Sequence, residues 1–219
     1  MVIILAAIFF NVMPGKRNPD DKKAKLIGAV GATLAECGYH GLTLNKIAMA
    51  AGVSKPMAYE YFTNFNGLLK AYIAGKDSWV AYFQSLELPE KPTVEEMKEC
   101  FIKMLQDQFR YFHQDREMQK LVHWQVSEYN PLMRATCENR EREGKRLLDL
   151  VDAHFRNSGV SLKAVLALLV GGIYFNVLHD SAGVGTMAGV DIGNEKDFNI
   201  MLETIEQVIG WAFDAAGDK

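Results

Sequence analysis

The segment from Thr43 to Phe62, TLNKIAMAAGVSKPMAYEYF, constrains the fold of this chain more than any other stretch. Its apolar residues recur at helical spacing on both sides of Gly52, a residue suited to a tight turn. Two short helices joined by a turn that contains glycine form a helix-turn-helix. The pattern predicts that one set of apolar side chains faces inward, namely Ile47, Ala48, Val53, Ala58 and Phe62.

Pro56 lies where the second of these helices begins, and a proline in a helix interior would break it. If Ser54 is the N-cap, Pro56 takes the second helical position, where the backbone N–H has no acceptor within the helix. Proline also pushes Lys55 toward extended dihedral angles, which favours a helix that begins at Pro56 itself. We therefore expect Pro56 to stiffen the start of this helix without breaking it.

Helical signals dominate the rest of the chain, and no strand alternation of useful length appears. The sequence LPEKP at 88–92 is the clearest break in composition, and a charge-rich stretch fills 131–156. The sequence therefore predicts an all-α fold in two parts. We expect further helices at 20–37, at 64–86, after Thr93, at 118–128, at 161–179 and at 195–215, with a glycine-rich loop between the last two.

Charge is distributed unevenly along the chain. Residues 14–78 contain nine Lys or Arg and five Asp or Glu, a net charge of +4, whereas residues 79–219 carry −7. A basic N-terminal part on an acidic remainder indicates that only the N-terminal part meets a polyanion such as nucleic acid.

The three cysteines, Cys37, Cys100 and Cys137, are far apart and form no CxxC pair. This usage fits a reducing cytoplasm and does not resemble a disulfide framework. We expect a cytoplasmic protein. The five histidines show no metal-binding spacing, and no nucleophile-elbow motif appears, so the sequence predicts neither a metal site nor an enzyme.

Residues 1–13, MVIILAAIFFNVM, are almost wholly apolar. They are too few to span a bilayer, which needs about 20 residues, and they lack the basic start of a signal peptide. Either translation begins at Met13, which we favour, or these residues form a disordered or weakly membrane-seeking tail. The apolar run 164–175 has twelve residues, the length of a buried core helix, so we expect no membrane partner.

The block GYHGLTLNKIAMAAGVSKPMAYEYFTNFNGLL resembles the N-terminal signature of the tetracycline-repressor (TetR) family. The resemblance rests on the Gly-Tyr before a capped Thr, on the IA..AGVS turn and on the Y.YF ending followed by a Leu pair. It implies a dimeric, all-helical transcription regulator without a cofactor, in which a bound small molecule usually releases DNA. The implied domains are a helix-turn-helix DNA-binding domain at 14–65 and a helical ligand-binding and dimerisation domain at 66–219.

The same resemblance assigns roles to residues of the helix-turn-helix. Thr43, Lys46 and Tyr59 match positions that touch phosphates, and Lys55 and Met57 open the recognition helix. The expected DNA-binding residues are Thr43, Lys46, Ser54, Lys55, Pro56, Met57, Tyr59 and Glu60.

The sequence departs from the family pattern at three positions. Pro56 replaces a usual Gly, Met57 replaces a frequent Thr, and Phe65 replaces a Lys that commonly binds phosphate. These departures bear on the affinity for DNA and on the operator sequence. They motivate an alternative, a helical small-molecule-binding protein or an enzyme on this scaffold that has lost specific DNA binding.

The segment LVHWQVSEYNPL at 121–132 combines aromatic rings with one carboxylate, a mixture that suits a pocket for a largely apolar ligand. Trp124 and Glu128 are four residues apart and share a helix face. Each aromatic residue here has an equal claim to be an ordinary core residue. The expected ligand-binding residues are Phe109, Phe112, His123, Trp124, Glu128, Tyr129, Tyr174 and His179.

The expected helices at 162–179 and 195–215 are apolar on more than one face, more than the outer layer of a monomer needs. Pairing across a two-fold axis into a four-helix bundle would bury the surplus, with Gly171 and Gly172 allowing a close approach. Burial within one subunit is the alternative. We therefore expect a homodimeric regulator, a repressor by family expectation, that binds a near-palindromic double-stranded operator and is released by a small-molecule effector.

Overall fold

The computed structural model describes residues 19–76, 82–83 and 85–217. Within these ranges the regular secondary structure is helical, and an isolated bridge joins Met187 and Val190 in the glycine-rich loop, which confirms the predicted fold class. Residues 1–13 lie outside the described ranges. The helices are α1 (Pro19–Cys37), the short η1 (Tyr39–Gly41), α2 (Leu44–Ala50), α3 (Lys55–Phe62), α4 (Phe65–Lys76), α6 (Val94–Gln114), α7 (Arg116–Ser127), α8 (Pro131–Phe155), α9 (Leu162–Ser181) and α10 (Glu195–Gly217).

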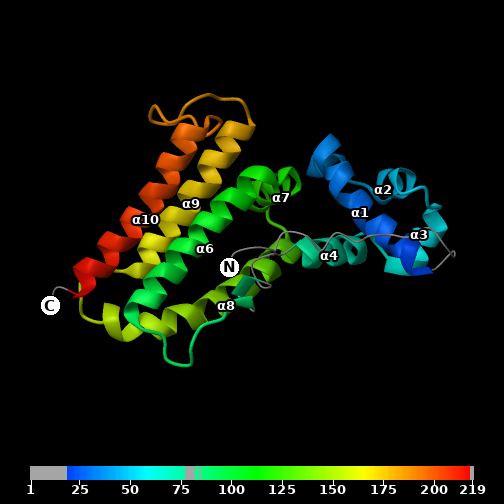
Figure 1. Ribbon diagram of the computed structural model, residues 1–219. Helices are drawn as coiled ribbons and strands as arrows, with labels where there is room; N and C mark the ends of the chain where they lie inside the picture. The colour runs from blue at the N-terminus through cyan, green and yellow to red at the C-terminus, as the bar shows by residue number, and fades with distance from the viewer. Residues whose placement is uncertain (1–18, 77–81, 84, 218–219) are drawn as a thin grey trace.

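The helices form two groups, as Figure 1 shows. Helices α1, η1, α2 and α3 gather at one end of the molecule, and we call them the head. Helices α6, α9 and α10 lie side by side at the other end with α8 along one edge, and together with α7 they make the body. Helix α4 packs on α1 and α3 and also reaches α8, so it links the head to the body.

The head follows the predicted helix-turn-helix. The Thr43 hydroxyl begins α2 by accepting a hydrogen bond from the Lys46 N–H at 3.3 Å, and Gly52 turns the chain with φ of 63°. Helix α3 begins at Lys55, one residue before the expected Pro56, and continues unbroken through the proline. The apolar residues predicted to face inward are all buried, namely Ile47, Ala48, Val53, Ala58 and Phe62.

The turn between α3 and α4 is held by two local features. The side chain of Asn64 accepts a hydrogen bond from the Gly67 N–H at 2.9 Å. A Cβ atom on Gly67 would lie 2.3 Å from the carbonyl oxygen of Phe62, so the chain passes too closely here for any other residue. Phe65, at the departure from the family pattern, is half-buried and packs against the core.

The body is built around the apolar face of α6. Thr93 and Glu96 begin this helix with a reciprocal capping box, in which the Thr93 N–H donates to the Glu96 carboxylate at 2.7 Å. That backbone hydrogen bond lowers the pKa of Glu96. Further along α6, Phe101, Phe109 and Phe112 are almost completely buried and supply the centre of the core.

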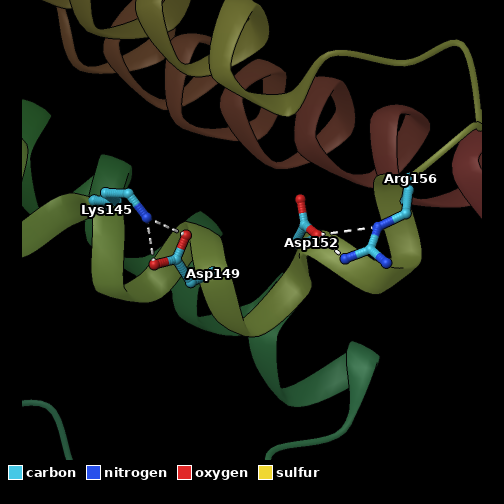
Figure 2. A network of polar contacts seen from close by, with 4 residues as sticks. All are labelled: Lys145, Asp149, Asp152 and Arg156. Atoms are coloured by element: carbon cyan, nitrogen blue, oxygen red, sulfur yellow. Dashed lines mark hydrogen bonds and ion pairs between the residues drawn. The ribbon is translucent and has the colours of Figure 1, made fainter.

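The charge-rich stretch 131–156, for which the pattern predicts no particular element, forms α8. The Asn130 side chain caps it by accepting a hydrogen bond from the Leu132 N–H at 2.9 Å. Figure 2 shows how ion pairs between residues four apart follow one another along its exposed face, Lys145 with Asp149 and then Asp152 with Arg156. Such pairs stabilise a helix whose apolar stripe is narrow.

Helix α9 has 20 residues and so extends beyond the twelve-residue apolar run at 164–175. By length and composition its 20 residues suffice to cross a membrane, and 17% of its apolar window is buried within the chain. Leu168 and Phe175 are 78% and 58% exposed, and Trp211 on the neighbouring α10 is 62% exposed. An apolar surface of this kind marks an interaction site.

Candidate nucleic-acid interface and ligand cavity

The exposed face of the head runs across α2 and α3. Of the eight predicted DNA-binding residues, Met57 is half-buried and the other seven are exposed. The exposed residues lie on α2, on α3 and at the caps that precede them, namely Thr43, Lys46, Ser54, Lys55, Pro56, Tyr59 and Glu60.

The cations and hydroxyls of this surface are available to an anion. Among the residues that the structure describes, neither Lys46 nor Lys55 forms an ion pair. Thr43 uses its oxygen as an acceptor for the α2 cap, which leaves its hydroxyl hydrogen to donate. Ser54 occupies the N-cap position of α3 but makes no side-chain cap hydrogen bond. The arrangement suits phosphate binding by point charges and short hydroxyl donors.

A cavity of about 780 Å³ lies within the body. This volume is in the range of sites for drug-sized molecules. The cavity is lined by Phe83, Phe101, Met104, Gln125, Cys137, Arg140, Glu141, Arg142, Gly144, Lys145, Leu147, Leu148, Lys163, Leu166, Ala167, Val170 and Tyr174.

The lining separates into an apolar wall and a charged part. On α9, Leu166, Ala167, Val170 and Tyr174 follow helical spacing and form one apolar stripe. The charged residues are four cations and one carboxylate, namely Arg140, Arg142, Lys145, Lys163 and Glu141. The excess of positive charge favours a ligand with an anionic group.

Lys145 shares its charge with a carboxylate on the same helix. Lys145 forms hydrogen bonds from its Nζ to both carboxylate oxygens of Asp149, at 2.7 and 2.6 Å (Figure 2). Lys163 lies near the N-terminal end of α9, where the helix dipole adds to its positive charge. This end of the cavity is therefore electropositive.

Of the eight predicted ligand-binding residues, Tyr174 lies in the lining and the other seven lie elsewhere. Phe109 and Phe112 are core residues. The first stacks on Phe198 with ring centroids 4.5 Å apart, and the second packs on Tyr174 at 4.9 Å. His179 lies beside Phe175 at 5.9 Å.

Three more of the predicted ligand residues lie where the head meets the body. The Trp124 ring stacks on Tyr39 of the head at 5.6 Å, with ring planes 3° apart. His123 lies 6.2 Å from the same tyrosine ring. The Glu128 carboxylate lies 3.5 Å from the His40 ring nitrogen. Aromatic stacking here holds the two groups of helices together rather than a ligand.

Tyr129, the last predicted ligand residue, is 78% exposed and lies outside the cavity. Two sequence signals point to the residues that do line it. One is the apolar stripe on α9 that begins at Lys163, and the other is the cluster of cations at 140–146 followed by two leucines. Neither signal identifies a cavity by itself, because α9 is apolar on all its faces and the cations on α8 alternate with glutamates.

Metal binding has no support in the described part of the chain. No group of three or more His, Cys, Asp or Glu side chains there could hold a metal ion.

The sequence of the head matches a known protein family. Residues 31–72 match the model of the family described as bacterial regulatory proteins, tetR family. The N-terminal domain belongs to the TetR family. The resemblance seen in the sequence is confirmed, and the match supports a DNA-binding transcriptional regulator. The TetR match extends into α4, beyond the helix-turn-helix itself.

Solved structures share the fold of most of the chain at low sequence identity. FadR from Bacillus subtilis, in complex with stearoyl-CoA, has a TM-score of 0.59 at 16% identity and covers 85% of this chain and 96% of its own. FadR from Bacillus halodurans, a fatty acid degradation regulator, has a TM-score of 0.61 at 17% identity, with 89% and 96% covered.

A TetR transcription regulator from Haloarcula marismortui has a TM-score of 0.60 at 17% identity and covers 90% of this chain and 98% of its own. No curated protein matches the sequence. These identities show a common fold, and the proteins matched are named as regulators rather than as enzymes.

Proposed function

We propose that this protein is a cytoplasmic repressor that binds a near-palindromic operator as a homodimer and releases it when a small molecule binds in the body. The observation that carries the proposal is the exposed surface of α2 and α3, where unpaired lysines and hydroxyls lie together on a TetR-family domain. Its exposed lysines and hydroxyls suit the phosphates that border a DNA major groove. A regulator of this kind needs no catalytic group and no cofactor.

The residues of this surface divide by chemistry. Thr43, Lys46 and Tyr59 contact phosphates, which fix the position of the head on the duplex. Lys55 and Met57, at the start of α3, reach the base edges, where a flexible thioether suits the methyl group of thymine. Pro56 and Glu60 flank these contacts on the same helix, and Ser54 precedes it.

Dimerisation rests on the exposed apolar surface of α9 and α10. A second copy paired through the helices near 162–179 and 195–215 would cover Leu168, Phe175 and Trp211 and remove them from water. Gly171 has no atom within 4 Å of the position of a Cβ atom, so the surface is open there for a partner helix. The two recognition helices of such a dimer would enter successive major grooves.

We divide the chain for this function into a DNA-binding domain at 14–65 and a ligand-binding and dimerisation domain at 66–219. Helix α4 begins at this boundary and touches both parts. Phe65, at the start of α4, packs against the core and provides no charge for a phosphate.

The effector is an amphiphile that occupies the cavity. An apolar chain would lie along the α9 stripe, and an anionic group would lie at the electropositive end near Lys163. This refines the expectation of a largely apolar ligand, because the charged part of the lining carries net positive charge. Stearoyl-CoA, which the FadR structure from Bacillus subtilis contains, has both of these features.

Selection of sheared genomic DNA tests the proposed function. Protein that begins at Met13 is mixed with DNA at about 50 and about 200 mM salt, and the retained fragments are sequenced. We expect one short palindrome to be enriched, retention to fall steeply with salt, and Tyr59→Ala to abolish enrichment. Tyr129→Ala, equally a loss of an exposed tyrosine but in the body, is the matched control and should retain the palindrome.

Two outcomes would contradict the proposal. Uniform retention of all fragments would show a basic head without sequence specificity. No retention at either salt, from protein denatured and refolded to remove any bound ligand, would favour the alternative of a ligand-binding protein that no longer recognises DNA.

Titration calorimetry tests the effector class. Stearoyl-CoA and palmitate should bind the protein, whereas octadecanol should bind at least tenfold more weakly because it lacks the anionic group. Lys163→Gln should weaken both anionic ligands, and Lys103→Gln, a lysine on α6 outside the cavity, should leave their affinity unchanged. Equal binding of octadecanol and palmitate would contradict the assignment of the anionic end.

A further inference from the structure

Helix α7 holds the head at two places along one of its faces. Near its N-terminal end, the Glu117 side chain lies against α1 and α4, and seven residues later Trp124 stacks on Tyr39 of the head. Residues seven apart lie on the same face of a helix. In Figure 1, α7 lies between the rest of the body and α1, and α7 packs against α1.

The Glu117 carboxylate joins two side chains of α4. Its Oε2 accepts a hydrogen bond from the Tyr72 hydroxyl at 3.0 Å, and it lies 2.7 Å from the Lys76 Nζ. Tyr72 is 2% exposed. Burial, and then the neighbouring Glu117 charge, raise the pKa of Tyr72. The hydroxyl therefore stays protonated and remains a donor to the carboxylate.

Gly31 on α1 makes room for this carboxylate. A Cβ atom at position 31 would lie 2.2 Å from Glu117 Oε2 and 2.5 Å from Oε1, far inside contact distance. The obstructing atoms are the end of a flexible side chain. Alanine at this position would therefore displace the carboxylate from Tyr72 and Lys76 while leaving the backbone of α1 in place.

Helix α7 is anchored on α6 and also reaches the cavity. The buried Gln119 side chain donates hydrogen bonds to the carbonyl oxygens of Phe112 and His113, at 2.9 and 3.0 Å, and so fixes α7 to the end of α6. Gln125, next to Trp124, lines the cavity. Helix α7 thus contacts both the ligand site and the head.

We propose that Gly31, Glu117, Tyr72 and Lys76 form a clamp that sets the orientation of the head on the body. The inference rests on the proposed function, because in a dimer this orientation fixes the distance between the two recognition helices. Glu117 is a positioning residue that acts through the head. A clamp that holds both heads in register favours an operator with two half-sites and has no effect on the binding of one half-site.

Gly31→Ala tests the clamp, with Gly28→Ala as the matched control. Both substitutions add a methyl group to α1, but the Cβ at position 28 meets no atom within 4 Å. The probes are the palindromic duplex selected from genomic DNA and a duplex that carries one of its half-sites. We expect Gly31→Ala to bind the palindrome about tenfold more weakly and the half-site duplex within twofold of wild type, whereas Gly28→Ala binds both as wild type does.

A double-mutant cycle with Glu117→Ala shows whether the methyl group acts through the carboxylate. Once the carboxylate is removed, Gly31→Ala should cause no further loss of affinity for the palindrome. Thermal unfolding should show that Gly31→Ala is still folded at the temperature of the binding assay, because the helix preference of alanine offsets part of the cost of losing the Glu117 contacts with Tyr72 and Lys76.

Three results would overturn the clamp. These are equal affinity of Gly31→Ala and Gly28→Ala for the palindrome, equal weakening on both duplexes, and additive effects in the cycle. Should wild type select no duplex, the proposed function fails and the clamp is tested by acrylamide quenching of Trp124, with Trp79 and Trp211 replaced by Phe. Gly31→Ala should then increase quenching relative to Gly28→Ala, and equal quenching would overturn the clamp.

Discussion

The contacts within the head join residues close in sequence, whereas the contacts within the body join residues far apart in sequence. In the head, α2 packs on α1 and α3, and caps and turns of a few residues set the path of the chain. In the body, α6 packs most extensively on α10, and the Gln106 amide donates to the Leu202 carbonyl at 3.0 Å across 96 residues of sequence. The geometry of the head therefore depends on local backbone chemistry, and that of the body on how large side chains from distant segments fit together.

The two regions also differ in what they expose. The head presents charged and hydroxyl groups on α2 and α3, whereas α9 and α10 of the body present large apolar side chains. A surface of the first kind binds a polyanion, and a surface of the second kind binds another apolar surface. The following predictions, from the largest expected effect to the smallest, use substitutions that separate these regions.

Phe109→Ala should lower the free energy of unfolding by about 3–5 kcal/mol, because it removes a completely buried ring that stacks on Phe198. Denaturant unfolding followed by circular dichroism measures the loss. Val126→Ala, at a 66% exposed position of the body, should change it by less than about 0.5 kcal/mol. If folded Phe109→Ala protein lost affinity for DNA, the core of the body and the DNA-binding surface would not be separable.

Gly67→Ala should lower the free energy of unfolding by about 1–3 kcal/mol, because the new Cβ atom would lie 2.3 Å from the backbone oxygen of Phe62. Gly75→Ala on the same helix meets no atom within 4 Å and should be neutral or stabilising. Thermal unfolding of both variants measures the difference. Equal stability of the two variants would show that the turn between α3 and α4 can shift to make room for a Cβ atom at position 67.

Thr43→Ala should cost about 1 kcal/mol of stability, because the Thr43 hydroxyl caps α2 at the Lys46 N–H. Ser54→Ala should cost less than about 0.5 kcal/mol, since Ser54 makes no side-chain cap hydrogen bond. Chemical denaturation without DNA isolates these effects from binding. A larger loss at Ser54 than at Thr43 would contradict the assignment of the caps.

Lys46→Gln should reduce the slope of log affinity against log salt by about 0.9 for each half-site, the amount expected from the loss of one phosphate contact. Lys103→Gln in the body should leave the slope unchanged, because Lys103 pairs with Asp107 on α6. Filter binding to the selected duplex at several salt concentrations measures both slopes. An unchanged slope for Lys46→Gln would remove this residue from the phosphate contacts.

Much of the head could be predicted because its signals are local. The Thr43 cap, the turn at Gly52 and the tolerance of Pro56 all follow from the chemistry of residues within one turn of each other. The structure places α3 one residue earlier than the proline rule favours, because Lys55 adopts the helical conformation despite the following proline.

The ligand cavity could not be predicted in the same way. The predicted helix face shared by Trp124 and Glu128 is wrong, because α7 ends at Ser127 and Glu128 is its C-cap with extended dihedral angles. Both residues lie against the head, at Tyr39 and His40, rather than in the cavity. An aromatic ring in a pocket and an aromatic ring in an interface have the same sequence signature. Which of the two it becomes depends on the helix that packs against it.

The sequence by itself determined the helical class, the helix-turn-helix and its family, and the inward set of apolar residues in the head. These features depend on periodicity, caps and turns, whose energies arise between near neighbours in the chain. The tertiary structure decided where α8 lies, which residues line the cavity, and how the Glu117 carboxylate comes to lie against Gly31 and Tyr72. Those features depend on contacts between helices far apart in sequence, and no local pattern records which helices will meet.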